Sequence, residues 1–147
     1  MTHSRIFFLM AACLTVAACA ETPIPPLDLK EKLAGKSPED RQEILGLACL
    51  DEAQKMNSKW KRTGRSTVLV SDPHLNETKA LCLRMTVAYL SSDTKKHVAL
   101  AQQCKERISP ALHSDNSTII EHAHRMQEVC EEMTGQKLHI DYTKSAD

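Results

Sequence analysis

The sequence is poor in aromatic residues and in glycine, with one Trp, two Tyr, two Phe and four Gly among 147 residues. So few glycines leave no Gly-rich loop of the kind that cradles phosphate. The Gly-x-Ser-x-Gly pattern of serine hydrolases and the His-Glu-x-x-His pattern of zinc proteases are also missing. Since no group of residues suggests catalysis, we expect neither an enzyme nor a bound cofactor.

The chain also lacks an excess of charge of either sign. Lys and Arg together number 19 and Asp and Glu together number 19, so the formal net charge is zero. Proteins that bind nucleic acid over a wide area usually carry a positive excess. The overall charge therefore gives no reason to expect a nucleic-acid partner.

The one long apolar run lies at the N-terminus, where Ile6 to Val16 contains no charged residue. A short polar segment ending in Arg5 precedes it and small residues follow it, which is the layout of a secretory signal. The run is shorter than the roughly 20 apolar residues that a membrane-spanning helix needs. Ordinary signal peptidase could cut after Ala20, because Ala18 and Ala20 are both small.

The same small residues form the motif Val16-Ala17-Ala18-Cys19 at the end of the apolar run. This motif resembles the lipobox of bacterial lipoprotein precursors. The resemblance implies cleavage before Cys19 and attachment of diacylglycerol, usually with a further acyl chain, to that cysteine. Two or more acyl chains hold a protein firmly at a membrane. In enteric-type bacteria an Asp after the lipidated cysteine favours the inner membrane, so Ala20 predicts the outer membrane, facing the periplasm.

These patterns divide the chain into four segments. Residues 1–18 are the expected signal peptide, and residues 19–36 are the lipidated N-terminus with a tether. Three prolines between positions 23 and 26 favour an extended spacer. Residues 37–135 are the expected four-helix domain, and residues 136–147 are a polar C-terminal tail that we expect to be loosely ordered.

Four stretches have apolar residues at helical spacing. They cover residues 37–58, 72–90, 93–108 and 114–135. Ser37 before Pro38 is typical of a helix start, whereas Ser109-Pro110 and Gly135 are typical of helix ends. The second stretch is apolar nearly all round, so we expect it to be the most buried helix.

Residues 59–70 break the helical pattern. Thr67 to Val70 could be extended, but a single strand would have no partner, so we expect a loop. The loop contains a tryptophan among basic residues, which is a candidate contact with a partner or a membrane surface. The candidate residues are Trp60, Lys61, Arg62 and Arg65. A solvated loop with a half-buried tryptophan is the alternative.

Each expected helix carries one cysteine on its apolar stripe, namely Cys49, Cys82, Cys104 and Cys130. An exported protein folds in an oxidising compartment and four is an even number, so we expect two disulfides. The spacing includes no Cys-x-x-Cys pair of the zinc type, which disfavours a metal site. The pattern predicts an all-α fold, a disulfide-stapled four-helix bundle. All three possible pairings remain open.

A second ligand hypothesis concerns the last expected helix. His122 and Met126 are four residues apart and could together contact a soft metal such as copper. His122 and His124 project to opposite sides of a helix and cannot share an ion. We favour the alternative that His122 is a solvent-exposed histidine beside a core methionine.

These features predict a lipid-anchored, non-enzymatic accessory factor that binds a protein of the cell envelope. The expected design is similar to the small helical lipoproteins that serve as pilotins for secretion machines, although no pilotin motif is present. Lipoproteins of conjugation or of surface exclusion fit equally well. The alternative is a periplasmic carrier of copper or of a small apolar ligand.

Overall fold

The computed structural model describes residues 25–141, so the predicted signal peptide and Cys19 lie outside the described residues. The described chain is mostly helical, with five helices and one two-stranded hairpin. In order, they are α1 (Leu29–Leu33), α2 (Pro38–Met56), β1 (Ser58–Thr63), β2 (Ser66–Ser71), α3 (Leu75–Ala88), α4 (Thr94–Leu112) and α5 (Ser117–Thr134). The prediction of an all-α fold is therefore wrong, because residues expected to form a loop pair as two strands.

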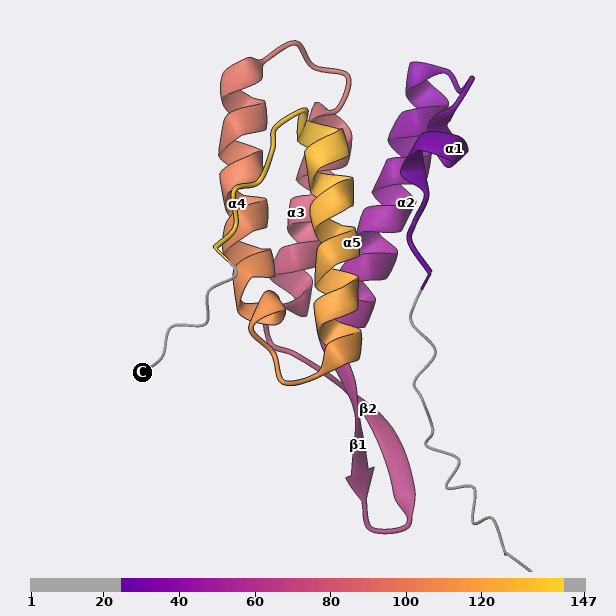
Figure 1. Cartoon of the computed structure of the whole chain (residues 1–147), viewed down its shortest axis with the longest axis vertical. Coiled ribbons are helices and arrows are strands. Elements are labelled where there is room, and N and C mark those ends of the chain that lie inside the picture. The colour runs from indigo at the N-terminus through magenta and orange to yellow at the C-terminus, as the bar shows by residue number, and fades with distance from the viewer. Residues whose placement is uncertain (1–24, 142–147) are drawn as a thin grey trace, which may run out of the picture.

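The four long helices α2, α3, α4 and α5 stand side by side, and we call them the helical body (Figure 1). Figure 1 also shows the hairpin projecting beyond one end of this body. In the body, α5 packs against both α2 and α4, and α3 packs against α2 and α4. The hairpin is joined to the body at its base only, between the end of α2 and the start of α3.

The predicted helix ends are set by local hydrogen bonds. The Ser37 side chain caps α2 by accepting a 3.1 Å hydrogen bond from the Asp40 N–H, with Pro38 in the first helical position. Gly135 ends α5 in the left-handed conformation, with φ of 65°. The predicted helix end at Ser109-Pro110 is wrong, because α4 continues to Leu112 with Pro110 in its last turn.

An aliphatic and sulfur-containing core fills the helical body. Its largest fully buried side chains include Leu45, Leu81, Met85, Ile108 and Met126. Since burial of each such side chain contributes about 1.5–3 kcal/mol, these contacts dominate the stability of the body.

Segments outside the four long helices complete the core. Leu29 and Leu33 of α1 are buried against it, so only the part of residues 19–36 that precedes them can serve as a free tether. Leu138 and Ile140 are buried as well, and the Gln127 side chain of α5 donates a 3.4 Å hydrogen bond to the Leu138 carbonyl. The expectation of a loosely ordered tail is therefore wrong for residues 136–141, which turn back after α5 and pass in front of α4 in the view of Figure 1.

The prediction that α3 is the most buried helix is also wrong. The stripe that contains Cys82 and Met85 faces the core, but Leu83, Val87 and Leu90 are 56%, 74% and 48% exposed. The reason is that α2 and α4 flank α3 on the core side, and no described element covers its outer side.

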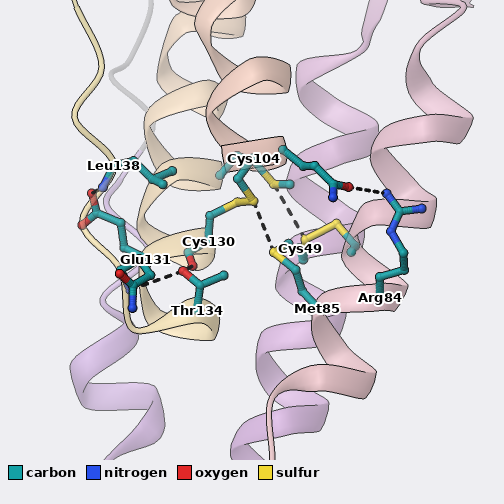
Figure 2. The surroundings of a disulfide bond; sticks show 12 residues. Cys49, Arg84, Met85, Cys104, Cys130, Glu131, Thr134 and Leu138 are labelled. Atoms are coloured by element: carbon teal, nitrogen blue, oxygen red, sulfur yellow. Dashed lines mark hydrogen bonds between the residues drawn. A yellow bond between two sulfur atoms is a disulfide. The ribbon is translucent and has the colours of Figure 1, made fainter. Parts of the chain in front are cut away.

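The two predicted disulfides are confirmed, and each joins helices that are neighbours along the chain. Cys49 of α2 is bonded to Cys82 of α3, and Cys104 of α4 is bonded to Cys130 of α5. Figure 2 shows the bonds deep between the helices, with the Met85 sulfur 3.2 Å from Cys104 Sγ. Because all four cysteines are fully buried, the staples lie within the core rather than on its surface.

Among the helices of residues 25–141, none is long and apolar enough to cross a membrane.

Candidate functional site

The hairpin forms because a tight turn joins two short strands. Gly64 and Arg65 connect the strands, and Gly64 has φ of 61°, as the first central position of a type II′ turn requires. The antiparallel register runs from Thr63 opposite Ser66 to Ser58 opposite Ser71. The sequence signal for this hairpin is limited to Gly64 at the turn, because β1 lacks the alternation of apolar and polar residues that marks a strand.

The hairpin is uncovered along its length. From position 61 to position 71 every residue is exposed, and the consecutive apolar residues Val68, Leu69 and Val70 are among them. A two-stranded hairpin without a packed face is at best marginally stable in water. Val68 and Val70 lie on one face of this arm and Leu69 lies on the other, so both faces present apolar area that another molecule can contact.

Positive charge is concentrated on the same arm. Lys59, Lys61, Arg62 and Arg65 lie between Ser58 and Ser71, and this segment contains no Asp or Glu. The whole chain has a formal net charge of zero, so the remainder of the chain carries a net negative charge and the hairpin is a local positive region.

The structure brings the predicted contact residues Trp60, Lys61, Arg62 and Arg65 onto this one arm. Trp60 pairs with Leu69 across the strands, while its side chain lies outside the described part of the chain. The prediction was based on a tryptophan among basic residues, and it did not include the exposed apolar residues Val68, Leu69 and Val70 of β2.

A groove of about 830 Å³ lies between the base of the hairpin and the helical body. Its lining includes Lys59, Lys61 and Val70 of the hairpin and Arg107, Pro110 and Ile119 of the body. Lys59 and Val70 are cross-strand partners, and Lys61 is two residues further along β1, so these three side chains share one face of the hairpin. That face therefore forms one wall of a groove whose lining is apolar and charged, with Asp72 and Glu106 beside the basic residues.

A second cleft, of about 560 Å³, lies at the opposite end of the helical body. Tyr89 lines it together with Arg41 and Glu132. Burial and the nearby Glu132 carboxylate raise the pKa of the Tyr89 phenol, and Arg41 opposes this by a hydrogen bond and its positive charge. The tyrosine therefore stays protonated at neutral pH and contributes a hydroxyl to this cleft.

The interface between α2 and α5 contains a buried polar cluster. His122 is 7% exposed, which overturns the expectation of a solvent-exposed histidine. Its Nδ1 lies 2.6 Å from Oε2 of Glu52, and Arg125 Nη1 donates a 3.3 Å hydrogen bond to Oε1 of the same carboxylate. Glu52 is therefore held by two partners from α5.

The copper hypothesis involved His122 and Met126. Met126 is fully buried, and its sulfur lies 3.9 Å from Cys49 Sγ. Over residues 25–141, no group of three or more His, Cys, Asp and Glu side chains is arranged to hold a metal ion. The carrier alternative stays a prediction.

No protein-family model, curated protein or solved structure matches this chain.

Proposed function

We propose that this chain is a periplasmic lipoprotein, anchored to the membrane through Cys19, that binds a protein partner of the cell envelope without catalysing a reaction. In this proposal the helical body is a four-helix bundle that serves as a scaffold, and the hairpin with its groove is the contact surface. The partner belongs to a secretion, conjugation or surface-exclusion system.

One observation carries the proposal: the hairpin exposes consecutive apolar residues and four cations on an arm that its own helices leave uncovered. Protein interfaces combine an apolar centre with a polar rim, and arginine is enriched in them. Val68, Leu69 and Val70 supply apolar area, and the surrounding Lys and Arg side chains supply the rim. The lipobox-like motif at Cys19 supports the proposed anchoring at a membrane.

A crosslinking experiment in intact cells tests the contact surface. A photoreactive amino acid replaces Lys61 or Val68 in the full chain, and Lys95 is replaced as the control. Lys95 lies in the first turn of α4, at the end of the helical body far from the hairpin (Figure 1). We expect one discrete crosslinked protein from the hairpin positions and none from Lys95.

A charge-reversal variant tests whether the crosslink depends on the basic residues of the hairpin. Arg62→Glu, added to the Val68 reporter, reverses one charge of the rim without touching the helical core, so we expect the crosslinked band to weaken severalfold. Bands of equal intensity from Lys95 and from the hairpin, or no band from either hairpin position, would contradict the proposed contact surface.

A further inference from the structure

Strand β1 has a free backbone edge whose hydrogen-bonding groups can be assigned. The Asp72 N–H donates a 2.7 Å hydrogen bond to the Asn57 carbonyl, one pair beyond the ladder. Bonded and non-bonded pairs alternate along an antiparallel ladder, so the pairs of Lys59 with Val70 and Lys61 with Val68 are bonded ones. Ser58, Trp60 and Arg62 of β1 therefore direct their backbone N–H and C=O groups away from β2.

In the described chain no third strand pairs with that edge, because the sheet has only the two strands. An exposed strand edge is a template on which another extended segment can pair. The edge of β1 is also where the cations are, since Lys59, Lys61 and Arg62 are all in this strand.

The positive charges of β1 determine which extended segment can pair with its edge. The side chains of an added strand lie directly beside those of β1, so acidic residues would meet Lys59 and Lys61 on one face and Arg62 on the other. A second copy of this chain, pairing through the same edge, would place cations beside cations and is disfavoured. The edge of β2 carries Val68, Leu69 and Val70 and offers no such charge selection.

The groove adds a second element of recognition. Lys59 and Lys61 form part of its wall, so side chains of an added strand on this face would point toward the groove. Arg107 adds a cation to this lining, and Ala111 and Ile119 add apolar surface. Arg107 is paired with Glu77, and Asp72 and Glu106 also line the groove. The attraction for an acidic residue on the added strand therefore comes from Lys59 and Lys61.

We infer that the partner contributes an extended segment with acidic residues at alternate positions, which adds to the sheet as a third strand along the free edge of β1. This inference rests on the proposed function, and it specifies the chemistry of the partner and the way in which it binds.

The test uses the full processed chain, labelled with ¹⁵N in detergent micelles, and a capped eight-residue peptide that alternates Glu with Val or Thr. We expect the peptide to slow amide hydrogen exchange at Ser58, Trp60 and Arg62. A peptide with Gln in place of every Glu should bind at least about tenfold more weakly, because the charge pairs are lost. The peptide N-methylated at alternate amides, on the side that faces β1, should not bind.

A variant of the protein tests whether the charge of β1, and not a change in the fold, determines peptide binding. Lys61→Glu should weaken binding of the acidic peptide by at least about tenfold, whereas Lys95→Glu, on an exposed turn of α4, should leave it unchanged. The amide spectrum of the helical body should be the same in both variants.

Several results would overturn the inference. Equal binding of the Glu and Gln peptides would remove the acidic selection, and binding of the N-methylated peptide would remove strand addition. Slowed exchange at Thr67, Leu69 and Ser71 would place the ligand on β2. Protection of the hairpin by phosphatidylglycerol vesicles, but not by the acidic peptide, would make the arm a membrane contact.

The two proposals fail in different ways. If the hairpin gives a crosslinked protein in cells but the acidic peptide does not bind, the partner docks by another mode and only the strand-addition inference is wrong. If the hairpin gives no crosslinked protein, the proposed contact surface itself is wrong.

Discussion

Glu52 places a carboxylate in the apolar interface between α2 and α5, with 1% of the residue exposed. A buried charge is tolerated only when its oxygens are paired, and here His122 and Arg125 supply the partners. The adjacent residue Asp51 forms a different kind of pair, since its contact with Lys55 is exposed to solvent. These two neighbours on one helix therefore allow a matched comparison.

We expect Glu52→Ala to lower the free energy of unfolding by about 3–5 kcal/mol, because it leaves the polar groups of His122 and Arg125 without their buried partner. Asp51→Ala should change it by no more than about 1 kcal/mol, because exposed ion pairs contribute little. Urea denaturation of both variants measures the difference. Similar losses in the two variants would contradict the structural role assigned to Glu52.

Glu131 holds the C-terminal segment against α5. Burial by itself would raise the pKa of this carboxyl group, but hydrogen bonds from the Lys137 ammonium, the Leu138 N–H and the Gln127 amide lower the pKa below the usual value of 4.5. A lowered pKa means that the carboxylate stabilises the fold above the pKa of the unfolded chain. This stabilisation is lost as the pH falls through the lower pKa of the folded protein.

Acid should therefore release residues 136–141 from α5. We expect the Leu138 amide resonance to move toward its random-coil position as the pH falls below about 4.5, which is the usual glutamate value. Glu131→Gln should remove this pH dependence, whereas Glu128→Gln, on the same helix, should preserve it. A Leu138 shift that follows pH equally in all three proteins would rule out Glu131 as the titrating group.

The burial of His122 shows where reasoning from sequence reaches its limit for single residues. The helical spacing correctly placed Met126 in the core, because spacing along one helix determines which residues share a face. The partner that makes burial of His122 possible, Glu52, lies 70 residues away in the sequence. No pattern within the last helix could reveal that pairing.

At the level of whole elements, α2 and α3 approach closely where α2 carries Gly46. A Cβ atom at Gly46 would lie 2.8 Å from Oγ1 and 3.1 Å from Cγ2 of Thr86. The Thr86 side chain cannot easily move, since its hydroxyl donates a 2.9 Å hydrogen bond to the Cys82 carbonyl. Glycine is therefore needed at this position for the helices to pack, although it weakens a helix by itself.

We expect Gly46→Ala to destabilise the protein by about 1–3 kcal/mol through overpacking, even though alanine favours the helix by about 1 kcal/mol. Thr86→Ala should restore the lost stability when combined with Gly46→Ala, because the next nearest atom, the Thr86 Cβ, is 3.6 Å from the new methyl group. Thermal unfolding of the two single variants and the double variant tests this coupling. Additive effects, or a stabilising Gly46→Ala, would contradict the close approach.

The helices were predictable and the hairpin was not, for a physical reason. Ser37 and Gly135 mark helix ends by hydrogen bonds and dihedral angles that depend on local sequence alone. Strand β1, in contrast, is mostly Ser, Thr, Lys and Arg and has neither an apolar run nor the alternation that reveals a strand. Because β1 was not recognised, β2 seemed to lack a partner.

Periodicity also could not decide which of two apolar stripes on α3 is buried. Leu81 and Met85 face the core, and Leu83 and Val87 face solvent, although both sets have helical spacing. The choice is made by the positions of α2 and α4, which are tertiary information.

For the molecule as a whole, the lipid anchoring proposed from Val16-Ala17-Ala18-Cys19 can be tested directly. Cys19→Ser should abolish incorporation of labelled fatty acid and leave the precursor uncut, because lipid attachment precedes cleavage in the lipoprotein route that the motif resembles. Cys13→Ser is the matched control, and it should leave labelling and processing unchanged. Cell fractionation, labelling and gel mobility measure these outcomes.

A different result would indicate ordinary secretion. If the Cys19→Ser protein is still cut and is released into the periplasm, signal peptidase removes the N-terminus after Ala20, and the lipid anchor is not part of the proposed function.

The disulfide pattern determines what a protease could do to the exposed arm. The basic side chains of Lys59, Lys61, Arg62 and Arg65 make the hairpin an accessible target for trypsin-like enzymes, yet the whole arm lies inside the loop closed by Cys49 and Cys82. A cut there cannot separate the two fragments, which stay covalently joined through the core. Cleavage of the hairpin would therefore leave a nicked but intact helical body, still connected to its N-terminal segment until a reductant opens the bond.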